Sequence, residues 1–287
     1  MSPFDFLAFL AVLFAVGSGG LILWANPKRC ANQGAFGLFL NIAAWLACRS
    51  IAMHEHGGPQ WLRVTVFIGA FVPIALSLCK NSLVWHRWKA IFAASWWVIG
   101  LSVPLSVLPW TEWFIPSYSS EEIPIKGTGY FVFLGCSFVI YFLLIIEVLR
   151  QMRRVSGVTA IELQVVSLAA CFGAFLIFVR MAIGTFFPGD GLSQSSLIIV
   201  LFFLGASVQA CFIHRIFDAQ YLFRIATRYA LLIGATALAS YGVYRLCDRN
   251  LPLWLMFIFM ATATLAISRW LNGRLDRWLF QFPAAAA

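Results

Sequence analysis

The chain has 287 residues, of which 62% are hydrophobic and only 11% are charged. Its mean hydropathy is +0.87. A soluble domain is about half apolar and a quarter charged, so this composition excludes an ordinary water-exposed fold. The net charge is +9, but the basic residues collect at the ends of apolar runs, which argues against a nucleic-acid partner. The composition predicts an all-α, polytopic membrane protein whose main partner is the lipid bilayer.

Nine apolar runs follow one another along the chain. Each is close to the ~20 residues that a helix needs to cross ~30 Å of hydrocarbon. In chain order they cover about 6–24, 36–53, 62–84, 90–108, 130–149, 161–187, 192–213, 229–246 and 253–267. Pro73 and Pro104 lie inside the third and fourth runs, where each removes one helical hydrogen bond and can kink its helix. We therefore expect a bundle of about nine transmembrane helices.

The basic residues are distributed unevenly between alternate loops, and this predicts the orientation. Cytoplasmic loops of membrane proteins carry an excess of Lys and Arg. With the N-terminus outside, the cytoplasmic side receives Lys28, Arg29, Lys80, Arg87, Lys89, Arg150, Arg153, Arg154, Arg215, Arg224, Arg228, Arg269, Arg274 and Arg277. In this assignment Lys80 opens a basic loop that runs from 80 to 89. The sequence thus predicts an N-out, C-in topology.

Three arginines in or near outer helix ends are candidate ligand-binding residues. An ionisable group at membrane depth is costly and usually faces a cavity or a partner. Arg180 lies seven residues before Phe187, which is ~10 Å below the outer end of its helix, whereas Arg49 and Arg63 lie nearer the ends of theirs. If the three converge, they would line an outward-facing pocket for an anionic or carbonyl-bearing small molecule. The alternative is that these long side chains snorkel to external headgroups.

Catalytic and metal-binding patterns are missing from the sequence. There is no phosphate-binding glycine loop, nucleophile elbow or zinc-protease helix motif. His54, Glu55 and His56 share one Gly-Pro loop, but this spacing supplies too few ligands for a good transition-metal site. We therefore expect no enzyme activity, no cofactor and no metal in this chain.

Several short motifs resemble the N-terminal seven-helix sensor region of bacterial histidine kinases. The segment 26–36, NPKRCANQGAF, resembles the first cytoplasmic loop of that region, and Phe71-Val72-Pro73 is similar to a Phe-x-Pro found there. The strongest match is 214–218, HRIFD, which resembles the family's exit motif after the seventh helix. The segment 272–280, NGRLDRWLF, resembles a segment that follows two additional helices in many members.

This resemblance implies both a domain plan and a function. It implies a seven-helix sensor bundle at 1–217, an additional helical hairpin at 218–268 and an amphipathic cytoplasmic helix at 269–283, while 284–287 is set aside as an appended linker. The implied function is a sensory input module of a two-component system in the bacterial inner (plasma) membrane. It would bind a small ligand and act, as a homodimer, on a downstream kinase domain or partner.

The residues expected to relay the signal lie at the exit of the seventh helix and in the tail: His214, Arg215, Asp218, Leu275 and Trp278. The tail has one apolar helical face, which could instead rest on the cytoplasmic leaflet as an interfacial helix. No phosphoacceptor histidine box or ATP-binding domain follows, so we expect this chain to be the input part of a longer kinase. A small-solute transporter or channel and a non-catalytic membrane partner subunit are the alternative functions.

Overall fold

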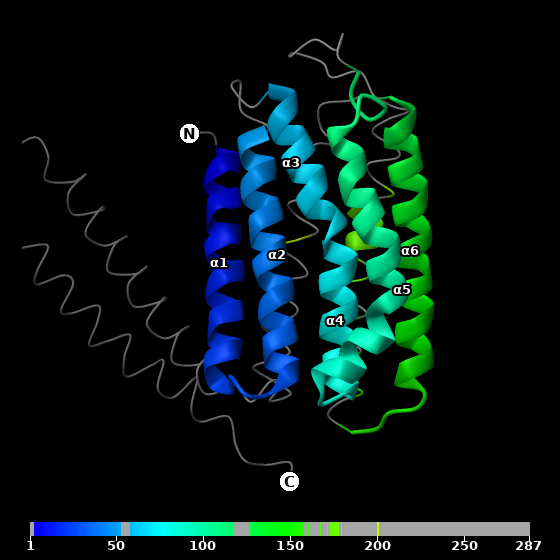
Figure 1. Ribbon diagram of the computed structural model, residues 1–287. Helices are drawn as coiled ribbons and strands as arrows, with labels where there is room; N and C mark the ends of the chain where they lie inside the picture. The colour runs from blue at the N-terminus through cyan, green and yellow to red at the C-terminus, as the bar shows by residue number, and fades with distance from the viewer. Residues whose placement is uncertain are drawn as a thin grey trace, which may run out of the picture. The chain divides into compact units, whose positions relative to one another are not determined.

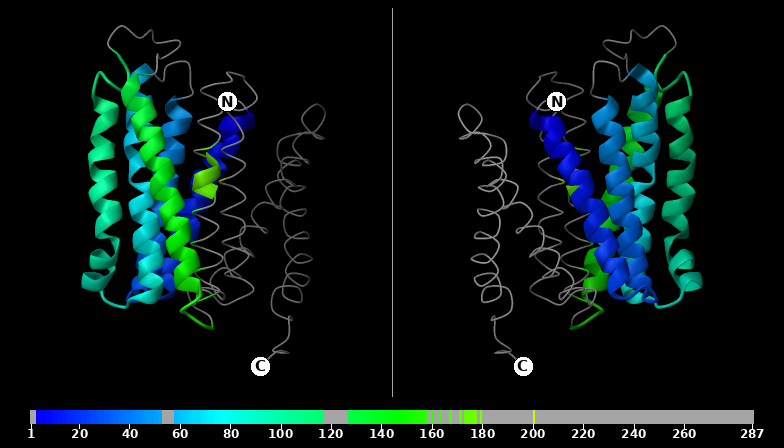
Figure 2. Two further views of the ribbon diagram at one scale, coloured as in Figure 1. Left: turned by 90° about the vertical axis from the view of Figure 1, so that its right-hand side faces the viewer. Right: turned by 90° about the vertical axis from the view of Figure 1, so that its left-hand side faces the viewer.

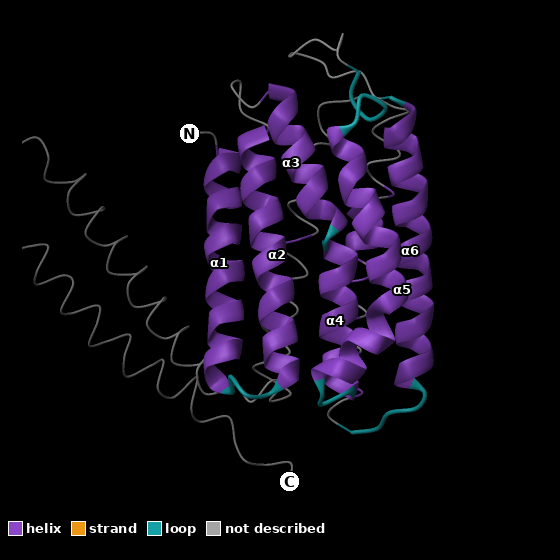
Figure 3. Cartoon of the chain, viewed as in Figure 1, coloured by secondary structure: helices purple, strands orange, loops and turns teal. Residues whose placement is uncertain are grey.

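The computed structural model describes residues 3–52, 58–116 and 127–157, together with residues 160, 163, 167, 171, 173–177, 179 and 200. The chain divides into two compact units, Met1–Gln220 and Tyr221–Ala287, and all described residues belong to the first. Every regular element in the described ranges is a helix (Figures 1 and 3). The predicted all-α class is confirmed for this part of the chain.

The described elements form five membrane-length segments. In chain order they are α1 (Pro3–Ala25), α2 (Cys30–Ala52), α3 (Gly58–Ala70), α4 (Val72–Val84), α5 (Trp88–Val107), the 3₁₀ helix η1 (Leu108–Trp110) and α6 (Thr128–Met152). The stretches Ala8–Ala25, Cys30–Ala52, Gln60–Val84, Trp88–Trp110 and Thr128–Met152 are each long and apolar enough to cross a membrane. They correspond to the first five predicted runs and make the chain a multi-pass membrane protein. Most of the sixth run and nearly all of the last three lie outside the described residues.

The third segment is interrupted at Phe71, which separates α3 from α4. The Phe71 amide donates to the Ile68 carbonyl, three residues back, at 3.1 Å, which is a tighter turn than that of an α-helix. Pro73 follows two residues later and has no N–H to give to the Gly69 carbonyl. The predicted kink at Pro73 is therefore confirmed as a helix break. Pro104 behaves differently, because α5 continues past it to Val107.

Helix α2 lies between α1 and α4 and packs closely against both. Glycine makes this approach possible: a Cβ atom added at Gly19 of α1 would lie 2.9 Å from Phe39 Cβ. One added at Gly34 of α2 would lie 3.1 Å from Cys79 Cα and would also clash with the Ser82 hydroxyl. The core of the described bundle is thus built by backbones that approach at small residues, as is common between membrane helices.

Large apolar side chains cover the outside of the described helices. The most exposed are Trp24 (73%), Trp96 (70%) and Trp113 (74%), and many further Phe, Leu and Val side chains on α1, α5 and α6 are about half exposed. A water-soluble protein rarely exposes so much contiguous apolar surface. This surface suits lipid chains, with the hydrogen-bonding groups of the backbone satisfied within each helix.

The five membrane-length segments run alternately up and down, so the connections between them gather at two ends (Figure 1). Figure 2 shows the same arrangement from two sides, with α1 inclined to the other helices. At the upper end in Figure 1, the Gly127 amide donates to Phe114 O at 2.9 Å and the Gly129 amide to Trp113 O at 2.8 Å. These two bonds hold the start of α6 against the segment that follows η1.

The lower end in Figure 1 carries a set of basic residues contributed by three connections and by the helix ends beside them, and we call it the basic end. Its members are Lys28, Arg29, Arg87, Lys89, Arg150, Arg153 and Arg154. The sequence predicted that these residues share one side of the bundle, and in the described part of the chain they do.

Two predictions about this end are wrong in detail. Helix α2 begins at Cys30, six residues before the predicted start of the second apolar run, because the polar Asn32 and Gln33 are accommodated within the helix. Asn32 is fully buried and donates to the Ile22 carbonyl of α1 at 2.7 Å. Lys80 does not open a loop: α4 continues to Val84, and Lys80 is fully buried inside the bundle. The helix can include this charge because, as described below, a carboxylate on α6 neutralises it.

Candidate functional site

Two of the three predicted ligand-binding arginines lie in the described part of the chain, and each has a contact of its own. The Arg49 guanidinium lies over the Trp45 ring, with 5.6 Å between Cζ and the ring centroid, which is a cation–π geometry. Arg63 Nη2 donates to the Ile115 carbonyl at 3.1 Å and so ties α3 to the segment after η1. Arg180 lies outside the described residues, so the convergence of the three stays a prediction.

The predicted relay residues also lie outside the described part of the chain. They are His214, Arg215, Asp218, Leu275 and Trp278, and the same holds for the His54, Glu55 and His56 loop. Among the residues that are described, no group of three or more potential ligands could hold a metal ion.

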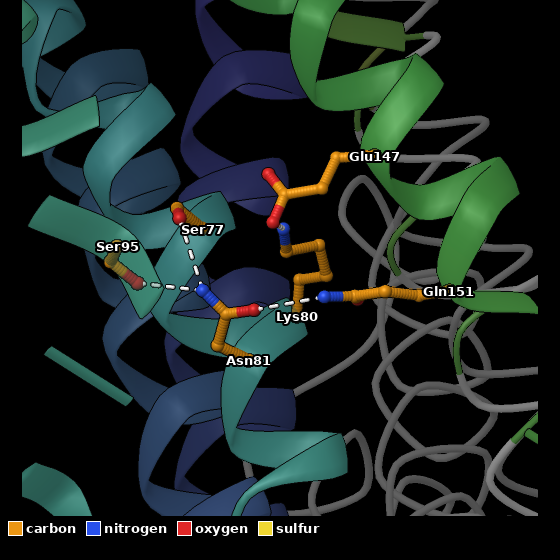
Figure 4. Close-up of polar contacts among 6 residues, drawn as sticks. All are labelled: Ser77, Lys80, Asn81, Ser95, Glu147 and Gln151. Atoms are coloured by element: carbon orange, nitrogen blue, oxygen red, sulfur yellow. Dashed lines mark hydrogen bonds and ion pairs between the residues drawn. The ribbon is translucent and has the colours of Figure 1, made fainter. Parts of the chain in front are cut away.

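The described bundle contains a buried ion pair that the sequence analysis did not anticipate. Lys80 Nζ of α4 lies 2.6 Å from Glu147 Oε1 of α6 (Figure 4). At this distance the ammonium and the carboxylate form an ion pair. Lys80 is fully buried, whereas the Glu147 side chain is 28% exposed.

The ion pair lies about one helical turn inside the basic end. Lys80 comes four residues before the last residue of α4, and Glu147 comes five residues before the last residue of α6. At 1.5 Å per residue these separations are about 6 Å and about 7.5 Å. The pair is therefore within the apolar length of both spans but close to their basic end.

Asn81, the residue after Lys80, joins three helices through its amide. Its Nδ2 donates to the Ser95 hydroxyl of α5 at 2.8 Å, and its Oδ1 accepts from Gln151 Nε2 of α6 at 3.3 Å. A longer contact of 3.5 Å reaches the Ser77 hydroxyl on α4 itself. We call the residues drawn in Figure 4 the polar cluster: Ser77, Lys80, Asn81, Ser95, Glu147 and Gln151.

Helical spacing explains why these side chains meet. Ser77 precedes Lys80 by three residues and Asn81 by four, and Glu147 precedes Gln151 by four. Residues at these spacings lie on one face of a helix. These spacings were readable in the sequence, because both sets interrupt apolar runs on a single helical face. The charges had been assigned to loops by position along the chain. Lys80 was therefore predicted to lie in a connection, and Glu147 was not identified as a candidate site residue.

Part of the sixth apolar run also approaches the polar cluster. Cys171 is buried and lies close enough to Lys80 and Glu147 to interact with both electrostatically. Its thiol is a weak hydrogen-bonding group that usually behaves as a small hydrophobe in a core. Cys171 is therefore a largely apolar neighbour of the ion pair.

The chemistry of the cluster is that of a hydrogen-bonding site with no net charge. One ammonium is balanced by one carboxylate, and the remaining members are hydroxyls and amides. Ionisable groups inside a membrane bundle are costly and commonly mark ligand sites, ion paths or switching elements. The cluster is the strongest candidate for a functional site within the described part of the chain.

Comparison of the chain with protein-family models, curated proteins and solved structures gives no match. The resemblance to histidine-kinase sensor regions therefore stays a prediction that depends on the short motifs quoted above.

Proposed function

We propose that this chain is a membrane-embedded sensory input module with its basic end on the cytoplasmic side. The motifs that resemble histidine-kinase sensor regions suggest this class. The charge distribution supports the orientation, because Lys28, Arg29 and the five other basic residues of the basic end are gathered there and cytoplasmic ends are enriched in Lys and Arg. In this proposal about nine helices cross the inner membrane, and a downstream kinase domain or partner receives the signal.

The observation that carries the proposal is the ion pair between Lys80 on α4 and Glu147 on α6. It connects two helices about one turn from the end at which an output domain would attach. Breaking it leaves a fully buried ammonium without its counter-ion, which is strongly unfavourable. An arrangement of α4 and α6 that separates the two charges would therefore be penalised, and a ligand that favours this arrangement by a comparable free energy would shift the population toward it.

Arg49, Arg63 and Arg180 remain the proposed outward-facing ligand residues. Arg63 fits a role in transmission as well, because its bond to Ile115 connects α3 with the segment that precedes α6. A ligand that moved Arg63 would disturb the same segment that holds the start of α6. Movement of α6 would then reach Glu147 at the basic end.

A small-solute transporter is the second candidate, and the break at Phe71 favours it. Phe71 is eleven residues from one end and thirteen from the other end of the segment Gln60–Val84, so the break lies near mid-depth. Transporters often bind their substrates at discontinuous helices near the middle of the bilayer. The polar cluster, however, lies within seven residues of the basic end of its helices, away from this break.

Solute flux through purified protein in proteoliposomes separates the two candidates. Vesicles with and without the protein are subjected to osmotic jumps with glycerol, urea and potassium chloride, and swelling is followed by light scattering. A sensory module leaves the swelling rates equal to those of protein-free vesicles. Flux that requires the protein, and that Glu147→Gln reduces, would overturn the sensory proposal in favour of transport.

A further inference from the structure

The polar cluster contains three buried polar atoms whose hydrogen-bonding capacity the described residues leave partly or wholly unmet. They are Lys80 Nζ, Glu147 Oε2 and Gln151 Oε1. An ammonium group has three N–H donors, and the ion pair with Glu147 Oε1 engages at most one direction of it. Buried polar groups are nearly always hydrogen-bonded, so the incomplete hydrogen bonding of these three atoms requires an explanation.

The unmet capacity specifies what a bound molecule must offer. It must accept a hydrogen bond from the Lys80 ammonium, and it must donate to Glu147 Oε2 and Gln151 Oε1. A molecule that can only accept hydrogen bonds would be repelled by the two oxygen atoms. A molecule that can only donate them would be repelled by the ammonium. A molecule that carries a donor and an acceptor close together satisfies all three atoms.

The charge of the cluster restricts the ligand further. Lys80 and Glu147 already neutralise each other, and Ser77, Asn81 and Gln151 are neutral. A ligand with a net charge would leave one charge unbalanced in surroundings of low dielectric constant, and such burial is costly. A net-neutral or zwitterionic ligand leaves the charge balance intact.

The position of the cluster points to the basic end as the side of access. Gln151 is partly exposed and lies two residues before Arg153, which is exposed. Glu147 is partly exposed as well, whereas Lys80 is fully buried. The side chains that carry the two acceptor oxygens are therefore less buried than Lys80 and lie next to the basic end, although the two oxygen atoms themselves are buried.

We propose that the polar cluster is a binding site for a small, net-neutral molecule with adjacent hydrogen-bond donor and acceptor groups, such as a zwitterion or a small amide, reached from the basic end. The proposal rests on the proposed function in one respect, since it supplies that module with a second, cytoplasm-facing ligand site. The site differs from the predicted outward-facing arginines in position and in charge. A molecule bound between Lys80 and Glu147 would hold α4 and α6 together.

A set of four probes of similar size tests the proposed ligand class. Glycine is zwitterionic, acetamide is neutral, acetate is an anion and methylammonium is a cation. Molecules this small bind weakly, so each is added at about 100 mM to the detergent-purified full chain, with sodium chloride as the ionic-strength control. A ligand present at ten times its dissociation constant shifts the unfolding equilibrium by a factor of about 11, which thermal unfolding detects.

The control is the double variant Lys80→Met/Glu147→Leu, which removes both charged halves of the site. Osmolytes stabilise any folded protein by exclusion from its surface, and the double variant measures that general effect. We expect glycine and acetamide to raise the midpoint of unfolding more in the wild type than in the double variant. Acetate and methylammonium should act on the wild type as sodium chloride does.

Two results would overturn the proposal. One is an equal response of the wild type and the double variant to all four probes, and the other is a larger wild-type shift with either ion than with glycine. If the double variant does not fold, Gln151→Leu serves instead, because it keeps the ion pair and removes one acceptor. This readout is independent of flux, so transport through the protein would refute the sensory function without refuting the ligand class.

Discussion

Removing the two partners of the buried ion pair one at a time should have unequal effects. Glu147→Gln leaves the Lys80 ammonium fully buried with no carboxylate beside it. Lys80→Met leaves Glu147, whose side chain is 28% exposed and lies about 7.5 Å from the basic end of α6. That carboxylate can turn toward water or toward a nearby arginine, whereas the ammonium cannot. We therefore expect Glu147→Gln to be the more destabilising change.

The magnitudes follow from two competing estimates. Breaking a buried ion pair in a protein costs about 3–5 kcal/mol, whereas polar contacts between membrane helices average about 0.6 kcal/mol and reach about 1.7 kcal/mol. Full burial of Lys80 places Glu147→Gln nearer the first range, at about 3 kcal/mol. Partial exposure of Glu147 places Lys80→Met nearer the second, at about 1 kcal/mol. Methionine also keeps most of the packing, because it is long and flexible.

The double variant Lys80→Met/Glu147→Gln completes a thermodynamic cycle. Because neither charge remains, its stability should lie within about 1 kcal/mol of the wild type. The assay is reversible unfolding in mixed micelles at increasing SDS, followed by tryptophan fluorescence. The reasoning is refuted if Lys80→Met costs as much as Glu147→Gln, or if the two losses simply add in the double variant.

Three further substitutions test other contacts of the bundle. Gly34→Ala should lower stability by about 1–3 kcal/mol through overpacking between α2 and α4, whereas Gly37→Ala, whose Cβ would meet nothing within 4 Å, should be neutral or slightly stabilising; equal thermal midpoints would contradict the close helix crossing. Asn81→Leu should cost about 1–3 kcal/mol, because it leaves the buried Ser95 hydroxyl and the Gln151 amide without their partner, and unchanged unfolding in SDS would contradict that role. Arg63→Met should speed amide exchange in 108–116 without changing exchange in α2, and unchanged exchange in that segment would show that the bond to Ile115 does not hold it.

Much of the fold could be predicted from hydrophobic run length alone. Five predicted runs of about twenty apolar residues correspond to five membrane-length segments. A helix that crosses the hydrocarbon layer needs a nearly fixed number of apolar residues, so run length alone predicts it. Pro73 gave a correct local prediction for a similar reason, since the lost N–H is a property of the residue itself. The start of α2 was misplaced because Asn32 and Gln33 were read as loop residues, although the Ile22 and Pro27 carbonyls accept their amide hydrogens.

The candidate site could not be predicted in the same way, because it depends on which helices lie side by side. Lys80 and Glu147 are 67 residues apart, and no local pattern connects them. Charge counting by loop assigned Lys80 to a cytoplasmic connection, since the basic residues Arg87 and Lys89 follow within nine residues of it. The spacing of Ser77, Lys80 and Asn81 on one helical face was the available signal for burial. Its partner on α6 could be recognised only once the packing of α4 against α6 was known.

The central claim is that the Lys80–Glu147 pair holds α6 against α4 at the basic end, and a distance measurement tests it most directly. Spin labels are placed at Arg87 and Arg153, both exposed, in a cysteine-depleted background that retains wild-type stability. Double electron–electron resonance then compares the wild-type pair with Glu147→Gln. We predict a shift of the mean distance by about 2 Å or more, or a clear broadening, in the variant. Identical distance distributions would contradict the claim.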